Sequence, residues 1–358
     1  MKKIIALLVV LFLLVSCGPT TGPETTPTGD GDKVKVALLI GNLGDLSFND
    51  SAYEGVKRAE AELNIDLNVI EYGSDPTKYE PSFLDAAEGG YDMVLASSTL
   101  QEAIEQNAAD FPDTVFTIFD SSVDYSTGNF DNVYSIVYKA NEGSYLGGYL
   151  MAKRSDTGVI GFLGGMDQPI ISDFLVGYIQ GAQAANPDIK VTFAYVGGWT
   201  DSPKGKELSL AMYNQNASSV FQVAGGAGLG TIEAGVDRGK EVLGVDSDQA
   251  LIFEAEGKQD YADVIVTSVL KNVGDSLYRA IDLFIKDELK VGEVDNLGIA
   301  EGGVGLAKNK YYEAAVDQAL RDELDAIEKD IVDGKIEVTS AYGLTTEQVN
   351  EIRDAVRP

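Results

Sequence analysis

Short apolar runs alternate with amphipathic segments along most of this chain. The runs are rich in β-branched and aliphatic residues and end at glycine or polar positions, which is typical of strands buried on both faces. The segments between them carry apolar residues at helical spacing. Strands are expected at 34–40, 67–71, 93–96, 115–119, 158–163, 191–195, 220–224 and 242–245, and helices at 50–63, 83–87, 100–109, 171–185, 204–214 and 232–238. This alternation predicts an α/β fold with parallel sheets covered on both faces.

The alternation occurs twice, first over 34–119 and again over 158–245, which predicts two doubly wound lobes. The chain length after residue 32 suits two lobes of about 150 residues each. Beyond them, the pattern predicts a long amphipathic helix at 269–286, strands at 291–297 and 300–306, and helices at 308–329 and 345–356.

The amino terminus has the pattern of an export signal. Lys2 and Lys3 precede the apolar run 4–15, which is shorter than the roughly 20 residues needed to span a bilayer. The following Leu-Val-Ser-Cys sequence, ending at Cys17, resembles a bacterial lipobox. That resemblance implies cleavage before Cys17 and lipid on its thiol. The alternative is an ordinary signal peptide that happens to contain the only cysteine of the chain.

Residues 18–32 contain proline, glycine, threonine and acidic residues, with no side chain able to build a core. Such a composition favours a flexible or extended spacer. The expected organisation is therefore a signal peptide at 1–16, a lipidated cysteine and linker at 17–32, and a folded body from 33 onward. We expect an extracytoplasmic protein held at the cell membrane by its lipid anchor, without access to cytosolic ATP or NAD.

Composition excludes several kinds of chemistry. The chain has no histidine and no cysteine other than Cys17, so catalysis by serine–histidine or cysteine–histidine pairs is impossible and internal disulfides cannot form. The usual zinc and iron sites are disfavoured for the same reason. The formal net charge of −30 disfavours binding to a nucleic-acid backbone.

Candidate binding residues follow the strands, because open α/β sheets bind ligands at the carboxyl ends of their strands. After the first strand, Phe48 lies in a polar, glycine-rich loop, where it could stack on a ligand or pack against the following helix. Ser47, Asn49 or Asp50 could cap that helix. Asp120 and Asp246 each end a strand. Each could face the crevice and accept hydrogen bonds, or cap the next segment.

Two glycine-rich turns also follow strands. Gly225 begins the sequence GGAGLG, which allows close backbone approach but lacks the spacing of the dinucleotide fingerprint. Asp246 nevertheless lies 20 residues after Gly226, as a ribose-binding acid would, so a dinucleotide site is a rival interpretation. Trp199, the only tryptophan, lies in a turn that suits either stacking or packing between lobes. Lys271 is expected near the start of the long helix.

Several sequence blocks together resemble the basic membrane protein family of bacterial lipoproteins, and within it the purine nucleoside receptors. The resemblance runs from about 34 to 306. The blocks occur in the same order along the chain and are 44–55, 143–148, 162–166, 201–207, 220–230, 244–249 and 267–271. One departure is the stretch 97–99, Ser-Ser-Thr, where relatives more often carry glycine; it puts the preference for a particular purine in doubt.

The resemblance implies a type I periplasmic-binding-protein fold, whose two lobes, joined by three crossovers, close on a nucleoside. It implies delivery to the permease of an ABC importer, with no enzymatic activity, cofactor or metal. We expect lobes formed by 33–139 with about 268–290, and by 140–267 with about 291–358, in a monomer.

The resemblance also implies roles for individual residues. Phe48 would stack on the base, with either Trp199 or Phe174 on its other face. The polar contacts would come from Asn49 and Asp120 to the base and from Asp246 and Lys271 to the ribose, with the backbone at Gly225 nearby.

Three alternatives stay open. A receptor of the same fold could bind riboflavin or a simple sugar. A surface adhesin would require a large apolar or basic patch. A nucleoside hydrolase could in principle use Asp45, Asp120 and Asp246 as calcium ligands, although the chain has no clustered D-x-D motif.

Overall fold

The computed structural model describes residues 33–358. The expected signal peptide, the linker and the lipidation site at Cys17 lie outside these residues. No helix of the described part is both long and apolar enough to cross a membrane.

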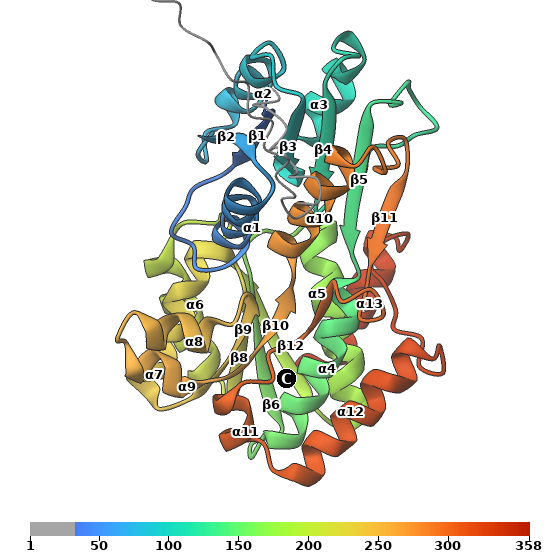
Figure 1. Ribbon diagram of the computed structural model, residues 1–358. Coiled ribbons are helices and arrows are strands. Elements are labelled where there is room, and N and C mark those ends of the chain that lie inside the picture. Colours follow the sequence, from blue (N-terminus) through green and yellow to red (C-terminus); the bar gives the residue numbers. More distant parts are fainter. Residues whose placement is uncertain (1–32) are drawn as a thin grey trace, which may run out of the picture. The chain divides into compact units, whose positions relative to one another are not determined.

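Two six-stranded sheets with equivalent strand orders form the body (Figure 1). The first lobe has the strand order β11-β5-β4-β3-β1-β2, and all its neighbouring strands are parallel. Its elements are β1 (Val34–Ile40), α1 (Phe48–Glu62), β2 (Ile65–Glu71), α2 (Tyr79–Ala87), β3 (Met93–Ser97), α3 (Gln101–Asn107), β4 (Val115–Phe119), β5 (Val133–Tyr138), α10 (Val273–Ile285) and β11 (Val294–Leu297).

The second lobe has the equivalent order β12-β10-β9-β8-β6-β7, in which only β12 runs antiparallel to its neighbour. Its elements are α4 (Ala140–Arg154), β6 (Val159–Gly164), α5 (Pro169–Ala185), β7 (Lys190–Tyr195), α6 (Ser202–Asn214), β8 (Ser219–Val223), α7 (Leu229–Arg238), β9 (Glu241–Asp246), α8 (Gln249–Ala255), α9 (Gln259–Val264), β10 (Ile265–Lys271), β12 (Val304–Leu306), α11 (Lys310–Ala315), α12 (Gln318–Val332) and α13 (Thr346–Ala355).

Strand β1 shows why the apolar runs are continuous and do not alternate with polar residues. Leu38 joins a core beneath α1 and α10, whereas its neighbour Leu39 joins a separate core with Phe83 of α2 and Ile104 of α3. Successive side chains of a strand point to opposite faces, so a sheet covered by helices on both faces needs apolar residues at every position. The expected fold class is confirmed.

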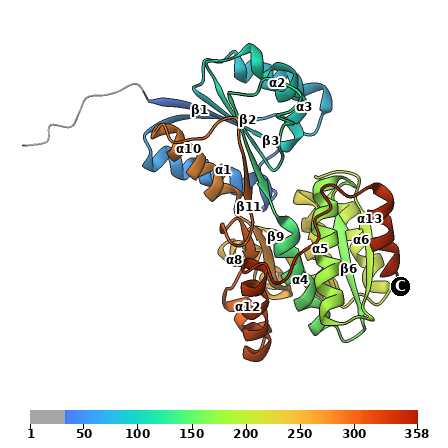
Figure 2. The ribbon, with the colours of Figure 1, turned by 90° about the vertical axis from the view of Figure 1, so that its right-hand side faces the viewer.

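The chain crosses between the lobes three times: from β5 to α4, from β10 to α10, and from β11 to β12 (Figure 2). The expected lobe boundaries differ at two of these crossings. β10 pairs with β9 and belongs to the second lobe as far as Lys271, not only to 267. β11 pairs with β5 in the first lobe, so the last return to the second lobe comes after Leu297, not after 290.

The helix predicted over 269–286 is wrong in its first turn. Residues Ile265–Lys271 form β10, which lies between β9 and β12 in the second sheet, and α10 begins only at Val273. Four of the residues at 265–269 are β-branched, a composition that favours a strand. Leu270 happens to share the helical spacing of α10, so periodicity alone placed the boundary too early. Lys271 therefore ends a strand.

Other differences have local causes. The pattern did not predict α4, because this helix is glycine-rich and buried on almost all sides and so has no amphipathic stripe. β5, α8 and α9 were also missed. The single helix expected at 308–329 is instead α11 and α12, because Asp317 caps a new helix by accepting a hydrogen bond from the Leu320 N–H at 2.9 Å.

Helices α4 and α5 pack backbone to backbone through glycines. A methyl group added at Gly181 would collide with the carbonyl oxygen of Tyr145, and one added at Gly148 would collide with that of Tyr178. This close packing fixes α5, whose first turns reach the functional site.

We predict that Gly181→Ala lowers the free energy of unfolding by about 1–3 kcal/mol, because the two helices must move apart to admit the methyl group. Gly305→Ala is the control, since a Cβ there meets nothing within 4 Å. Chemical denaturation of both variants checks the prediction, and equal stability of the two would contradict the packing argument.

Candidate functional site

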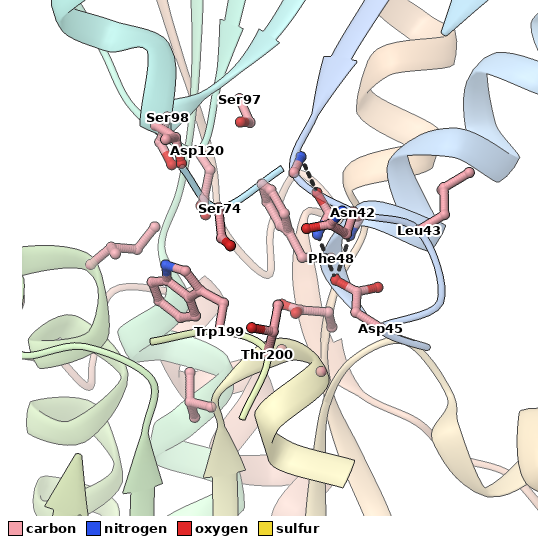
Figure 3. A pocket seen from close by; sticks show the side chains of 18 of the residues that line it. Asn42, Leu43, Asp45, Phe48, Ser74, Ser97, Ser98, Asp120, Trp199 and Thr200 are labelled. Atoms are coloured by element: carbon pink, nitrogen blue, oxygen red, sulfur yellow. Dashed lines mark hydrogen bonds between the residues drawn. The ribbon is translucent and has the colours of Figure 1, made fainter. Parts of the chain in front are cut away.

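A cavity of about 350 Å³ lies between the carboxyl ends of the two sheets (Figure 3). This position is the one expected for ligands of open α/β sheets, and the volume lies in the range of small-molecule sites. All eight binding residues expected from the sequence line it: Phe48, Asn49, Asp120, Phe174, Trp199, Gly225, Asp246 and Lys271.

The loop that leads into α1 is built around the buried carboxylate of Asp45. Its two oxygens accept hydrogen bonds from the backbone N–H groups of Ser47, Asn49 and Asp50 at 2.9–3.2 Å, and from the Asn49 side-chain amide at 2.8 Å. Asp45 thus satisfies the free donors at the start of α1, a role the sequence had offered to Ser47, Asn49 or Asp50.

The Asn49 amide is largely engaged within this loop. Besides donating to Asp45, it accepts a hydrogen bond from the Gly41 N–H at 3.1 Å. A side-chain amide keeps one further donor hydrogen and one further lone pair, which Asn49 can offer to the cavity.

The ring of Phe48 packs against the first sheet and also lines the cavity. Its ring packs against Phe119 of β4, with centroids 5.5 Å apart and planes tilted by 32°. It also lines the cavity and lies 4.6 Å from the Lys271 ammonium. The packing holds the ring in place, so a ligand that stacks on it meets a preorganised surface.

Trp199 and Phe174 differ in their availability. Phe174 is 1% exposed and packs against Phe221, with ring centroids 6.2 Å apart. Trp199 is only partly buried, and its ring lies over Gly165, where any Cβ would collide with it. Figure 3 shows Trp199 across the cavity from Phe48. Trp199 is therefore the more accessible of the two rings.

Asp120 and Asp246 occupy equivalent positions in the two lobes, directly after β4 and at the end of β9. Both adopt left-handed backbone conformations, with φ of +67° and +62°. Such conformations are uncommon for residues other than glycine and often occur at functional sites. Asp246 does not cap the next helix, because Asp248 accepts the N–H of Leu251 at the start of α8.

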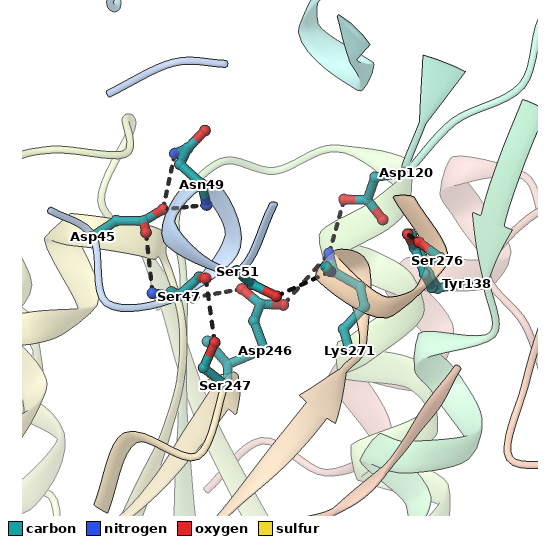
Figure 4. A network of polar contacts seen from close by, with 12 residues as sticks. Asp45, Ser47, Asn49, Ser51, Asp120, Tyr138, Asp246, Ser247, Lys271 and Ser276 are labelled. Atoms are coloured by element: carbon teal, nitrogen blue, oxygen red, sulfur yellow. Dashed lines mark hydrogen bonds and ion pairs between the residues drawn. The ribbon is translucent and has the colours of Figure 1, made fainter. Parts of the chain in front are cut away.

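Lys271 joins the two carboxylates (Figure 4). Its ammonium lies 2.8 Å from Asp120 and 3.5 Å from Asp246, and the residue is 4% exposed. Burial alone would lower the pKa of Lys271, but the two carboxylates outweigh it and hold this pKa above its ordinary value. Burial raises the pKa of Asp120, and the ammonium opposes that rise.

Asp246 retains an unused acceptor. One of its oxygens accepts the hydroxyl hydrogen of Ser47 at 2.5 Å, so a side chain of the first lobe reaches the second. The other oxygen is buried and accepts no hydrogen bond from the described residues, although Lys271 lies 3.5 Å away. A buried acceptor without a donor is costly, so this atom suits a hydroxyl or N–H of a ligand.

The glycines at 225–226 allow the chain to pass close to Trp199. Gly225 has φ of +54°, and the Trp199 carbonyl accepts the N–H of Ala227 at 2.8 Å. A Cβ at Gly226 would lie 3.3 Å from that carbonyl oxygen. These glycines thus fit the turn to Trp199, and Gly225 lines the cavity.

The sequence prediction missed several polar lining residues. Tyr72 follows β2 and Ser97 ends β3, with their hydroxyl oxygens 2.5 Å apart. Ser97 belongs to the stretch 97–99, identified from the sequence as a departure from the family pattern, and Tyr72 could have been found by considering the residue that follows β2. Ser74, Tyr79, Gln168 and Thr200 also line the cavity.

The turn that contains Gln168 is stabilised by Arg353, a residue far away in the sequence. Arg353 of α13 is 5% exposed and binds both oxygens of Asp167, at 2.7 and 3.2 Å, and the hydroxyl of Tyr195 at 2.6 Å. No periodic pattern indicates this contact, because its partners are far apart in sequence.

Among residues 33–358, no group of three or more acidic, histidine or cysteine side chains is placed to hold a metal ion. The aspartates that the hydrolase alternative would need are instead engaged with Lys271, Ser47 and backbone donors.

The fold and the cavity together define a type I periplasmic-binding-protein architecture. A solute-binding protein of an ABC transporter from Aeropyrum pernix K1 superposes with a TM-score of 0.79 at 23% identity, covering 90% of this chain and 98% of that one. A second, from Conexibacter woesei, has a TM-score of 0.69 at 22% identity, covering 86% of this chain and 99% of that one.

The chain belongs to the PnrA-like family of ABC transporter substrate-binding proteins, whose model matches residues 33–339. It is similar to basic membrane protein A of Borreliella burgdorferi, at 32% identity over 95% of this chain and 96% of that protein. It is also similar to the ABC transporter nucleoside-binding protein BmpA of Lactococcus lactis, at 30% identity over 87% and 92%. The family resemblance seen in the sequence is confirmed. The protein is a substrate-binding protein and not an enzyme, with a small-molecule ligand and a permease as its partners.

A pH dependence follows from Asp45, because burial raises the pKa of its carboxyl to about 6. A folded-state pKa above the ordinary 3.8 means that the folded protein binds this proton more tightly than the unfolded chain does. The resulting stability is fully present below about pH 3.8 and is lost as pH rises through about 6. We expect wild type to lose more stability than Asp45→Asn between pH 5 and 7, by up to about 1.4 kcal/mol per pH unit.

Urea denaturation at several pH values measures this difference. Parallel stability curves for the two proteins would show that Asp45 does not titrate in this range.

Proposed function

We propose that this protein captures a purine nucleoside by closing its lobes around it and delivers the nucleoside to the permease of an ABC importer. The observation that carries the proposal is a single cavity with opposed aromatic rings, Phe48 and Trp199, beside a buried carboxylate–lysine group. The nucleoside-binding name of the Lactococcus lactis relative supports the same ligand class.

The two parts of a nucleoside match the two parts of the cavity. The base lies between Phe48 and Trp199, where stacking contributes about 1–3 kcal/mol per base. Asp120 and the Asn49 side-chain amide form hydrogen bonds with the edge of the base. The free oxygen of Asp246 and the Lys271 ammonium serve the ribose hydroxyls, which can both donate and accept.

The charges in the cavity favour a neutral ligand. Asp120 and Asp246 outnumber the single cation Lys271, and Asp45 adds a third carboxylate to the lining. A phosphate on the ribose would meet this excess negative charge in a partly buried site. The ligand is therefore a nucleoside and not a nucleotide.

The amino-terminal sequence supports placement on the outer side of the cell membrane. A signal peptide at 1–16 and a lipid on Cys17 would tether the body through the spacer at 17–32. We infer that the body works there as a monomeric clamp.

Calorimetric titration of the full protein in detergent tests the ligand class. We expect guanosine to bind tightly, guanosine monophosphate to bind at least tenfold more weakly, and free ribose to give no heat. Comparable binding of the monophosphate would contradict the electrostatic argument. No heat with guanosine on folded, ligand-stripped protein would reject the nucleoside proposal, and riboflavin and simple sugars would be titrated next.

The second stacking ring can be identified by substitution. We expect Trp199→Ala to weaken guanosine binding about tenfold or more, because one face of the base loses its partner. Phe174→Leu should change the affinity less than about threefold, since the Phe174 side chain is almost completely buried and packs against Phe221. Calorimetry on both variants decides between them, and the reverse order of effects would assign the role to Phe174.

A further inference from the structure

Gln249 is a fully buried residue that does not line the ligand cavity, yet it connects the lobes. It is the first residue of α8 and has 0% exposure. Its side-chain N–H donates to the carbonyl oxygen of Leu46, in the first lobe, at 3.1 Å. Its side-chain oxygen accepts from the Gln222 amide at 2.7 Å and from the Val245 N–H at 3.2 Å, both within the second lobe.

The orientation of the Gln249 amide is fixed by its surroundings. Gln222 and Val245 both present donors, so the oxygen must face them and the NH₂ group must face Leu46. Two glycines leave the space that these amides occupy, since a Cβ at Gly228 would overlap Gln222 and one at Gly244 would lie 2.8 Å from the Gln249 oxygen. The second lobe therefore orients the Gln249 NH₂ group toward the Leu46 carbonyl oxygen.

The partner lies in a strained part of the ligand-binding loop. Leu46 has φ of +49°, which is unfavourable for a branched aliphatic residue. Its side chain packs against an apolar cluster of the second lobe that includes Ile232 and Phe253. Asp45, one residue before, and Phe48, two residues after, both line the cavity. Holding Leu46 against the second lobe thus fixes the position of Phe48.

We propose that Gln249 is a positioning residue that fastens the Asp45–Asn49 loop to the second lobe when the lobes close, and thereby sets how long the ligand stays bound. The contact exists only while Leu46 lies against the second lobe, so it stabilises the closed form over the open form. A ligand held between lobes leaves only when they open. This inference rests on ligand capture by lobe closure, as in the proposed function, but not on the identity of the ligand.

The test measures guanosine binding to the full protein by stopped-flow fluorescence, with Trp199 as the only tryptophan. Gln249→Met keeps the approximate volume and removes the hydrogen bond to Leu46. We expect dissociation to become about tenfold faster, while the association rate changes less than about twofold.

The matched control is Gln222→Met, which removes a buried amide from the same network but leaves the donor to Leu46 in place. We expect its dissociation rate to rise less than about threefold, even if its thermal stability falls as much as that of Gln249→Met. An unchanged dissociation rate in Gln249→Met, or an equal rise in both variants, would overturn the proposal.

A second variant and a ligand-free measurement cover the cases in which the first variant does not fold or guanosine does not bind. If Gln249→Met does not fold, Gln249→Ala replaces it, because alanine also removes the donor to Leu46 and introduces no buried charge. If wild type fails to bind guanosine, the proposed function fails, and X-ray scattering without ligand then tests Gln249 alone. A larger radius of gyration in the variant than in wild type would support the fastening role, and equal radii would reject it.

Discussion

The site depends on the burial of one positive charge between two negative ones. Lys271 is almost completely buried at the cavity, a position that is unfavourable for an ammonium group without partners. Asp120 from the first lobe and Asp246 from the second supply those partners. Removing one of these three side chains would leave a buried charge without a partner, which is strongly destabilising. The two ion pairs therefore hold the ends of β4, β9 and β10, which belong to two lobes, in one arrangement.

The two lobes share a strand order but differ in the residue at the end of the strand that carries Lys271. Asp120 and Asp246 follow equivalent strands, whereas the strand equivalent to β10 is β5, which ends at Tyr138 and not at a lysine. The Tyr138 hydroxyl lies 2.5 Å from that of Ser276, and its ring is 5.8 Å from the Lys271 ammonium. A second lysine there would place two like charges close together in a buried site. With one cation for two carboxylates, the cavity keeps spare acceptors and excess negative charge, which suits a neutral ligand rich in hydroxyl and N–H groups.

The loop before α1 brings the aromatic and the polar parts of the site together. Asp45 organises its backbone, and Ser47 and Leu46 contact the second lobe through Asp246 and Gln249. Phe48 lies in the middle of these contacts and rests on Phe119 of the first sheet. The same few residues thus support the Phe48 ring at the cavity and contact the opposite lobe, so one segment forms both the cavity wall and a contact between the lobes.

The sequence pattern predicted the fold class and eight of the residues that line the cavity, but not Tyr72, Tyr79 or Gln168. Continuous apolar runs require sheets covered on both faces, and the carboxyl ends of such strands converge, so Phe48, Asp120 and Asp246 could be placed together by rule. Periodicity could not separate β10 from α10, since Leu270 fits both patterns. Contacts in the folded protein were needed to show that Lys271 ends a strand and bridges two lobes, that Trp199 is more accessible than Phe174, and that Gln249 reaches Leu46. These facts depend on contacts between residues distant in sequence, for which local spacing carries no signal.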